Sequence, residues 1–189
     1  MTYRREIFPL LHASYKTPVE PRAFGDSQIS RPYLRYEDKT IAPVLFDLWK
    51  ELVRGRNLVI VEGRFTRMGI GNDLFAGAAS IRRVWCPPTG AFARYDEIVA
   101  AVKEIADKDD LIMLALGATA TILAYDLAKL GYQAIDAGHL DVEYVHLLKG
   151  LTVISPIEGR YVNECGDAGK EQQVVEDEES VNNVVRSLT

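Results

Sequence analysis

The sequence predicts an α/β fold in which one mostly parallel sheet is flanked by helices in a single domain. Short runs of aliphatic and β-branched residues alternate along the chain with stretches in which apolar residues recur at helical spacing. Such an alternation is typical of strands that return to one parallel sheet through crossover helices. A length of 189 residues, 48% of them hydrophobic, suits one domain with a sizeable core.

The chain begins with a proline-rich segment, residues 1–40, which we expect to form an irregular arm of the same domain. A helix is predicted next, because apolar residues recur at helical spacing between Pro43 and Gly55. Proline is favourable in the first turn of a helix, where its missing N–H loses no partner, and glycine is favourable after the last turn. We place the folded core at residues 41–165.

Strands and helices then alternate through the core. Strands are predicted at residues 58–61, 81–85, 111–116 and 132–135. Helices are predicted at residues 73–79, 95–106 and 119–130, and a further helix at 141–149 is followed by a strand at 151–154. Residues 166–189 include a run of four acidic side chains and are expected to form a solvated acidic tail.

Composition and spacing argue against several classes of protein. The apolar runs stay short of the ~20 residues that a membrane-spanning helix needs, and the first residues lack the pattern of a secretory signal, so we expect a cytoplasmic location. Cys86 and Cys165 stand apart in the sequence, which predicts free thiols and no zinc cluster. A net charge of −5 argues against general nucleic-acid binding, although residues 1–100 carry 15 basic against 11 acidic side chains and could meet a phosphate.

The least ordinary residues follow the predicted strands. In a parallel sheet the carboxyl ends of the strands share one edge, where loops and helix N-termini converge and ligands bind. We therefore predict a ligand site built from the four loops after the strands, at residues 62–73, 86–88, 117–121 and 136–143.

The first of these loops combines arginines with glycines. Arg64 and Arg67 could hold a diphosphate through their guanidinium groups, while Gly69 and Gly71 let the backbone approach it. The glycines begin a dinucleotide-type G-x-G-x-x-G pattern, but Leu74 occupies its third position, so the pattern is incomplete.

Two of the loops also have a purely structural interpretation. The glycine-rich loop can be a tight turn from strand to helix, capped by Asn72 or Asp73, with solvated arginines. The third loop runs from Gly117 to Thr119 and opens a helix directly after a buried strand, so its N–H groups point at the rim and favour an anion. Ordinary N-capping explains the same residues without a ligand.

The last loop carries an acidic pair, Asp141 and Glu143, separated by one residue. In an extended segment both carboxylates would project to one side and could bind a hard divalent cation, whereas on a helix they would diverge. His139 lies two residues before the pair and could bind the metal, donate to a phosphate or bond a backbone carbonyl. An isolated D-x-E pair is also common without any ligand.

Taken in order, these motifs resemble the GT-D-fold glycosyltransferases, a family first catalogued as a domain of unknown function. The similarity covers roughly residues 22–164, and its specificity lies in the ordered set of motifs. It is carried by Val61-Glu62-Gly63, Arg67-x-Gly69-Ile70-Gly71-Asn72-Asp73-Leu74-Phe75, Ile81-x-Arg83 to Cys86-Pro87, Leu116 to Thr121, Gly131 to Asp136 and Gly138-His139-x-Asp141-x-Glu143-Tyr144.

The resemblance implies a Rossmann-like domain that moves a hexose from a nucleotide-sugar donor, such as a UDP-sugar, to a glycan or glycoprotein acceptor. It also implies a divalent cation, Mn²⁺ or Mg²⁺, held by Asp141 and Glu143, which would neutralise charge on the leaving diphosphate. The candidate donor-binding residues are Asp26, Arg31, Glu62, Gly63, Arg67, Gly69, Gly71, Asn72, Asp73, Gly117, Thr119 and His139.

Other matching positions are less specific. Asn163 and Glu164 are candidate contacts to donor or acceptor, and Asp26 lies in a segment that departs from the Gly-Asp-Gly-Glu expected of the family. Glu62, Asp73 and Glu164 are all possible general bases, so the base stays open. Two alternatives also stay open: a non-catalytic nucleotide-sugar-binding module of a polysaccharide-assembly system, and a methyltransferase-like α/β enzyme whose usual glycine spacing is missing.

Overall fold

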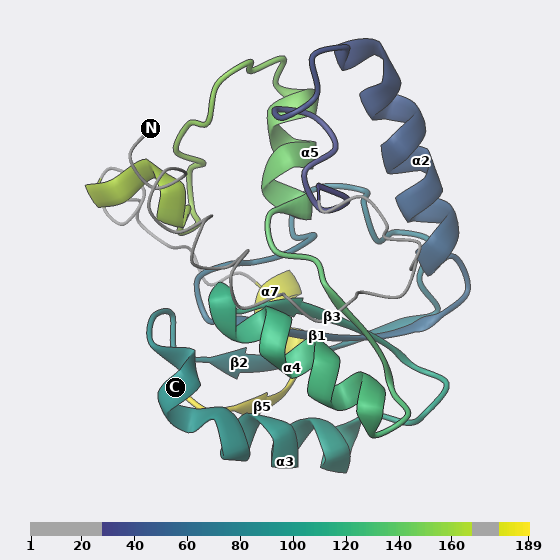
Figure 1. Cartoon of the computed structure of the whole chain (residues 1–189), viewed down its shortest axis with the longest axis vertical. Helices are drawn as coiled ribbons and strands as arrows, with labels where there is room; N and C mark the ends of the chain where they lie inside the picture. The colour runs from purple at the N-terminus through teal and green to yellow at the C-terminus, as the bar shows by residue number, and fades with distance from the viewer. Residues whose placement is uncertain (1–27, 168–177) are drawn as a thin grey trace, which may run out of the picture.

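The computed structural model describes residues 28–167 and 178–189 and confirms the predicted α/β fold (Figure 1). Five parallel strands pair in the order β4-β3-β1-β2-β5. Their bounds are Asn57–Gly63 for β1, Ser80–Cys86 for β2, Leu111–Ala115 for β3, Gln133–Asp136 for β4 and Val184–Ser187 for β5. The four predicted strands of the core therefore correspond to β1 to β4.

The helices cover both faces of the sheet. The α-helices span Ala42–Val53 (α2), Tyr95–Ile105 (α3), Ala118–Lys129 (α4), Leu140–Leu148 (α5) and Glu178–Asn182 (α7). Short 3₁₀ helices span Lys39–Ile41 (η1), Ala91–Arg94 (η2) and Asn163–Cys165 (η3). No helix in the described residues is both long and apolar enough to cross a membrane.

Alternation along the strands produces two separate hydrophobic cores. In β1, Leu58 and Ile60 pack on one side with residues of α2 and α5, while Val59 and Val61 pack on the other side with residues of α3 and α4. Figure 1 shows the same division, with α2 and α5 on one side of the sheet and α3 and α4 on the other. Because all four of these residues are fully buried, β1 is the centre of the fold.

The order of the strands creates a crevice at one edge of the sheet. From β1 the chain moves outward to β2, then returns to the opposite side of β1 to form β3. The loops after β1 and β3 therefore lead away from each other, and this divergence leaves a crevice beyond the carboxyl ends of the two strands.

Three predicted elements differ in the structure. Residues 73–79 form turns in place of a helix, with the Ala76 N–H bonded to the Asp73 carbonyl three residues earlier, because a segment this short that contains Gly77 has little helix propensity of its own. Residues 151–154 form no strand. The Leu151 N–H bonds instead to the carbonyl of His146 at the end of α5.

The third difference concerns the predicted acidic tail. Residues 184–187 form β5, which pairs with the far edge of β2, where Arg83 faces Val184 and Trp85 faces Ser187. The folded core therefore includes a strand beyond residue 165. A strand of four residues that follows a run of charge carries too short a pattern to be recognised in the sequence.

Candidate functional site

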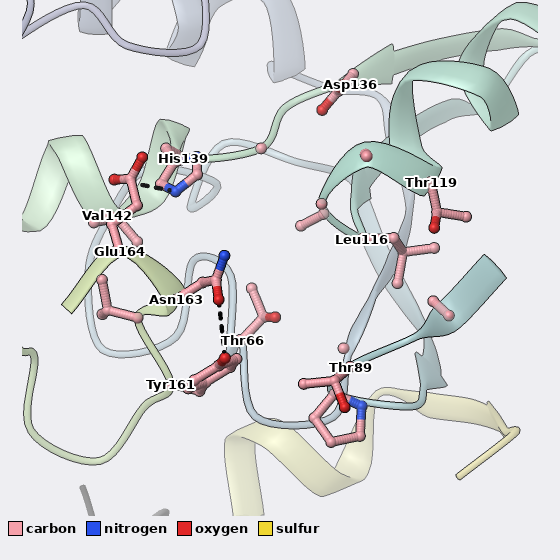
Figure 2. Close-up of a pocket in the computed structure, with 18 of the residues that line it drawn as sticks. Thr66, Thr89, Leu116, Thr119, Asp136, His139, Val142, Tyr161, Asn163 and Glu164 are labelled. Atoms are coloured by element: carbon pink, nitrogen blue, oxygen red, sulfur yellow. Dashed lines mark hydrogen bonds and ion pairs between the residues drawn. The ribbon is translucent and has the colours of Figure 1, made fainter. Parts of the chain in front are cut away.

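A pocket of about 750 Å³ lies at the predicted rim of the sheet (Figure 2). Every one of the first four strands contributes to it through its carboxyl end or the residues that follow. These residues are Gly63 at the end of β1 and Thr66 beyond it, Pro87 and Pro88 after β2, Leu116 to Thr119 after β3, Asp136 at the end of β4, and Gly138 and His139 beyond it. The pocket therefore occupies the crevice that the strand order creates.

One wall is the N-terminus of α4. Gly117 precedes the helix with φ 56° and ψ −141°, a left-handed backbone that favours glycine, and among the described residues no side chain caps this helix. The alternative interpretation, ordinary N-capping, is not supported by any side-chain cap among these residues, and Thr119 lies inside the helix as a buried pocket-lining residue. An uncapped N-terminus presents N–H groups and a positive dipole end, which favour an anion.

The opposite wall holds a charged cluster of Arg31, His139 and Glu164. The Arg31 guanidinium donates to both carboxylate oxygens of Glu164, at 3.3 and 2.7 Å, and to His139 Nδ1 at 2.8 Å. Because an arginine can only donate, Nδ1 must carry the lone pair, and the ring proton lies on Nε2, 3.3 Å from Glu164 Oε2. Figure 2 shows His139 and Glu164 facing Thr119 and Leu116 across the pocket.

The cluster also sets the charge states of its members. Burial, together with the nearby Arg31, lowers the pKa of His139 below its ordinary value, so the ring is neutral near pH 7. Burial alone would raise the pKa of Glu164, but the Arg31 hydrogen bond and His139 together hold it below its ordinary value. The wall therefore presents one cation, one anion and one neutral imidazole.

Several pocket residues were not singled out as candidates, although two of them, Thr66 and Asp136, belong to the predicted site loops. Asp136 lines the pocket and accepts a hydrogen bond of 2.7 Å from the Thr121 hydroxyl, and Tyr161 donates to Asn163 at 3.0 Å. Asp136 is the last residue of β4, so its position directly after an apolar run was the signal that could have identified it. Thr66 lies within the predicted loop of residues 62–73, whereas Tyr161 carries no comparable signal.

The predicted phosphate-binding arginines lie elsewhere. Arg64 stacks on aromatic rings, with its guanidinium carbon 5.4 Å from the centre of the Trp85 ring, and Arg67 donates to the Gly159 carbonyl at 3.2 Å. Neither belongs to the residues that line the pocket, whereas Gly63 and Thr66 do. The loop after β1 thus presents backbone and a hydroxyl to the pocket.

The glycines of this loop serve its own turn. Gly69 has φ 74°, and a Cβ atom there would lie 2.4 Å from the Phe75 ring. Asn72 accepts from the Leu74 N–H at 3.0 Å through its side-chain oxygen, which is a turn contact and not a helix cap. The structural interpretation of Gly69, Gly71 and Asn72 as a tight turn therefore describes the observed backbone, without the helix that was expected to follow.

Glu62 is fully buried beneath the same loop. Its carboxylate forms an ion pair of 2.6 Å with Arg83 and accepts from the Met68 N–H at 2.7 Å. Burial raises the pKa of Glu62 in spite of the adjacent arginine. Because Glu62 does not line the pocket, it has no position from which to contact a ligand there.

The two carboxylates of the D-x-E pair lie on a helix and diverge. Both belong to the first turn of α5, which begins at Leu140, so the extended segment that metal binding required is not formed. Asp141 is 2% exposed and accepts from the Gly69 N–H at 3.0 Å, from the Asn72 side chain at 2.7 Å and from Arg160. Glu143 is 1% exposed and points to another part of the chain.

Glu143 binds the backbone of the N-terminal segment. Its Oε2 accepts from the N–H groups of Tyr33 and Leu34, at 3.0 and 2.5 Å. Its Oε1 has no hydrogen-bond partner among residues 28–167 and 178–189. Of the four carboxylate oxygens of Asp141 and Glu143, only Glu143 Oε1 accepts no hydrogen bond from the described residues.

These contacts do not fit a divalent cation held by Asp141 and Glu143. Three of their four oxygens face N–H donors, which occupy the directions that a cation would need. Within the described parts of the chain, no group of three or more His, Cys, Asp or Glu side chains gathers closely enough to hold a metal ion. Neither carboxylate lines the pocket.

The remaining predicted residues divide clearly. Of the three candidate bases, Glu164 lines the pocket and Glu62 does not, while Asp73 lies outside it and pairs with Lys50 at 2.7 Å and with the Tyr144 hydroxyl at 2.5 Å. Asp26 lies outside the described residues. The site that the structure assembles therefore contains, among the predicted residues, Arg31, Gly63, Gly117, Thr119, His139, Asn163 and Glu164.

Comparison with known proteins yields one family. Residues 2–165 match the family model described as glycosyltransferase GT-D fold. The chain is 48% identical over 121 residues to the "Probable glycosyl transferase Gly" of Streptococcus gordonii and 42% identical over 127 residues to "Glycosyltransferase GlyD" of Streptococcus pneumoniae serotype 4. These matches cover 64% and 67% of this chain but 18% and 16% of the two relatives.

Solved structures agree with the sequence relatives. "A New Glycosyltransferase (DUF1792) from Streptococcus sanguinis" superposes with a TM-score of 0.87 at 35% identity, covering 99% of this chain and 69% of that one. A second structure, described as "The highly conserved domain of unknown function 1792 has a distinct glycosyltransferase fold", superposes with a TM-score of 0.85 at 36% identity. That match covers 98% of this chain and 66% of the other. From its sequence match and its fold, the chain belongs to the GT-D-fold glycosyltransferase family.

Proposed function

We propose that this chain transfers a hexose from a nucleotide-sugar donor, most simply a UDP-sugar, to a glycan or glycoprotein acceptor. The observation that carries the proposal is the pocket at the crevice of the sheet, into which the uncapped N-terminus of α4 opens. Family membership supports the reaction class. The donor and the acceptor are part of the proposal, because the chain spans less than a fifth of the curated relatives it matches.

The donor diphosphate is expected to lie at the N-terminus of α4. Backbone N–H groups after Gly117 and the positive end of the helix dipole favour an anion there. As the bond to the sugar breaks, negative charge grows on the leaving diphosphate, and donors that are already oriented stabilise that charge without reorganising. The Thr119 side chain, which lines the same wall, is placed to add a hydroxyl donor.

The sugar and the acceptor are expected on the opposite side, against Arg31, His139 and Glu164. Among the described residues, Arg31 is the only lysine or arginine that lines the pocket. Its bonds to Glu164 orient it, so it can meet a phosphate or a sugar hydroxyl with little loss of side-chain freedom. Of the candidate bases considered, Glu164 is the one in a position to accept a proton from an acceptor hydroxyl.

Dependence on Mn²⁺ or Mg²⁺ stays a prediction that follows from the family resemblance. We do not assign Asp141 and Glu143 as ligands of such an ion. A cytoplasmic location likewise stays a prediction. The non-catalytic module remains the second candidate, because the same pocket could bind a nucleotide sugar without turnover. The missing glycine spacing and the family match leave no support for a methyltransferase.

The test is a panel of nucleotide sugars added to the full chain, with and without EDTA, followed by thermal unfolding and calorimetry. A ligand at 100 times its Kd is expected to stabilise the fold by about 2.7 kcal/mol. Arg31→Gln should weaken donor binding, whereas Arg54→Gln, far from the pocket, should not. Stabilisation together with transfer to a glycan panel supports the enzyme, and binding without transfer or donor hydrolysis supports the module. If no nucleotide sugar binds, both are wrong.

A further inference from the structure

We propose that Asp141 and Glu143 are positioning residues that fasten two walls of the pocket, and that the D-x-E pair has this task in place of binding a metal ion. From the first turn of α5, Asp141 holds the loop of residues 64–72 and Glu143 holds the segment of residues 28–35. The inference rests on the proposed function, since it treats the pocket as the donor site.

The loop of residues 64–72 is held by two buried pairs of a carboxylate with an arginine. The first pair is Glu62 and Arg83, in which the carboxylate accepts from the Met68 N–H at 2.7 Å and the guanidinium donates to the Met68 carbonyl at 2.8 Å. The N–H and the C=O of Met68 are therefore both hydrogen-bonded by this pair. Within the pair, Arg83 Nη1 lies 2.6 Å from Glu62 Oε1.

The second pair, Asp141 and Arg160, repeats this arrangement one residue further along. The Asp141 carboxylate accepts from the Gly69 N–H at 3.0 Å, and Arg160 donates to the Ile70 carbonyl at 2.6 Å. Asp141 and Arg160 are also bonded to each other. Three consecutive loop residues, 68 to 70, are thus fastened by charged side chains from four separate parts of the chain.

The chemistry of the pairs matches the needs of the loop. Positive φ values at Arg67, Gly69 and Gly71 turn the backbone out of any regular ladder, so its buried N–H and C=O groups need side-chain partners. A carboxylate can only accept and an arginine can only donate, so each pair supplies one partner of each kind while neutralising its own charge. This arrangement gives Asp141 a complete set of contacts without a cation.

The spacing of D-x-E has a matching explanation. Side chains two positions apart on a helix project about 200° apart, because successive residues turn by about 100°. Asp141 and Glu143 therefore reach to different sides of α5, which is unsuitable for gripping one ion and suitable for holding two backbone segments. Glu143 reaches two consecutive N–H groups, those of Tyr33 and Leu34.

Both fastened segments carry pocket residues. Thr66 belongs to the loop held by Asp141, and Arg31 belongs to the segment held by Glu143. His139, directly before α5, and Val142, in its first turn, also line the pocket. A shift of either segment relative to α5 would therefore change the spacing of the groups that face the donor.

The decisive experiment replaces the charged pair of Asp141 and Arg160 by a neutral pair in the full chain. Asp141→Asn leaves Arg160 buried without its counter-charge, and we expect amide hydrogen exchange at residues 68–70 to become at least about tenfold faster, with weaker donor binding. Combining Asp141→Asn with Arg160→Gln keeps an acceptor for the Gly69 N–H and a donor for the Ile70 carbonyl. The double variant should recover most of the protection and of the donor Kd.

A metal ligand would behave differently, because replacing Arg160 cannot return the missing carboxylate. Titration with Mn²⁺ alone should give the same heat in the wild type and in the double variant. If the double variant exchanges as fast as Asp141→Asn, if Asp141→Asn alone leaves exchange unchanged, or if the double variant loses Mn²⁺ binding that the wild type has, the inference is overturned.

Glu143 provides a second variant that does not disturb a charge pair. Glu143→Gln keeps one oxygen for the Tyr33 and Leu34 N–H groups and should leave the KM for the nucleotide sugar and kcat within about twofold of the wild type. Glu143→Ala leaves one buried and one half-buried N–H group unpaired and should raise this KM about tenfold or more. Exposed Glu158→Gln is the matched control. Loss of activity in Glu143→Gln equal to that in Glu143→Ala would contradict a fastening role.

These readouts separate the inference from the proposed function. Amide hydrogen exchange at residues 68–70 is measured without any nucleotide sugar, so it tests the fastening role even if no nucleotide sugar binds the wild type. In that case the proposed function is wrong, and the rate of amide hydrogen exchange in the double variant alone decides whether the inference holds.

Discussion

The loops after β1 and β3 leave the same edge of the sheet and differ in how their polar groups are satisfied. In the loop after β1, buried carboxylates and arginines engage the backbone of residues 68 to 70. In the loop after β3, Gly117 leads straight into α4, and the described residues offer no side-chain cap. Both loops contain glycines with positive φ, so glycine alone does not distinguish them.

This difference separates architecture from ligand binding. A buried polar group that already has its partner gains little from a ligand, whereas an open helix N-terminus retains the capacity to bind one. The arginines of the first loop resemble phosphate ligands in the sequence, yet Arg64 lies over the Trp85 ring and Arg67 donates to the Gly159 carbonyl. The less conspicuous Gly117 loop is the one that brings an open helix N-terminus to the pocket.

The strongest test of the first loop is Arg83→Met. Arg83 is 1% exposed, so its removal leaves Glu62 buried and unpaired and should lower the free energy of unfolding by roughly 3–5 kcal/mol. Urea denaturation measures this change. The exposed pair of Arg54 and Glu51 is the control, and Arg54→Met should cost about 0–1 kcal/mol. Equal losses in the two variants would mean that the buried pair does not organise the loop.

Gly69→Ala tests whether the turn itself is tightly specified. A Cβ there adds a contact of 2.4 Å with Phe75 to the strain of φ 74°, and we expect a loss of roughly 2–4 kcal/mol. At Gly71, φ is 72° but no atom lies within 4 Å, so Gly71→Ala should cost only about 1–2 kcal/mol. Thermal unfolding of the two variants should show this order, and the reverse order would refute it.

Gly117→Ala should separate binding from stability in the second loop. Gly117 and Gly131 have φ 56° and 84°, and neither has an atom within 4 Å of an added Cβ, so Gly131→Ala should cost about 1–2 kcal/mol of stability and Gly117→Ala, with ψ −141°, about 1–3 kcal/mol. Only Gly117→Ala changes the entry to α4, and we expect it to weaken donor binding about tenfold in calorimetry. Equal donor affinity in the two variants would remove the α4 N-terminus from the site.

The smallest effect is expected at Asp73, at the end of the first loop. Hydrogen bonds from Lys50 and Tyr144 lower the pKa of Asp73, so its stabilising effect is present above the unfolded pKa, about 3.9, and is lost as the pH falls through the folded value. Because the side chain is 63% exposed, Asp73→Asn should cost less than about 1 kcal/mol near pH 7. Urea denaturation at a series of pH values should show this cost shrinking as the pH falls below about 3.9, and sugar transfer measured near pH 7 should be the same in the variant and the wild type.

Much of the fold could be predicted because its signals are local. The continuous apolar runs of β1 and β3 and the amphipathic faces of α2 and α3 follow directly from residue spacing. The short elements could not be predicted in the same way. Residues 73–79 and 151–154 have suitable residues but bond locally, whereas β5 forms because the edge of β2 offers it a partner.

The site shows the same limit. The rim of the sheet was predictable, because parallel strands align their carboxyl ends, and Gly117, Thr119 and His139 all lie there. The direction of each carboxylate was not predictable. Asp141 and Glu143 diverge because α5 begins one residue before the pair, and Glu62 turns inward because Arg83 lies on the neighbouring strand.

The sequence by itself therefore determined the α/β class, the position of the ligand site at one edge of the sheet and the resemblance to a family, because periodicity and motif order are properties of the chain alone. Only the tertiary structure decided which charged residues face the pocket and which fasten it. That choice depends on partners such as Arg83 and Arg160, which are distant in sequence, and a buried charge is stable only where the fold brings such a partner to it.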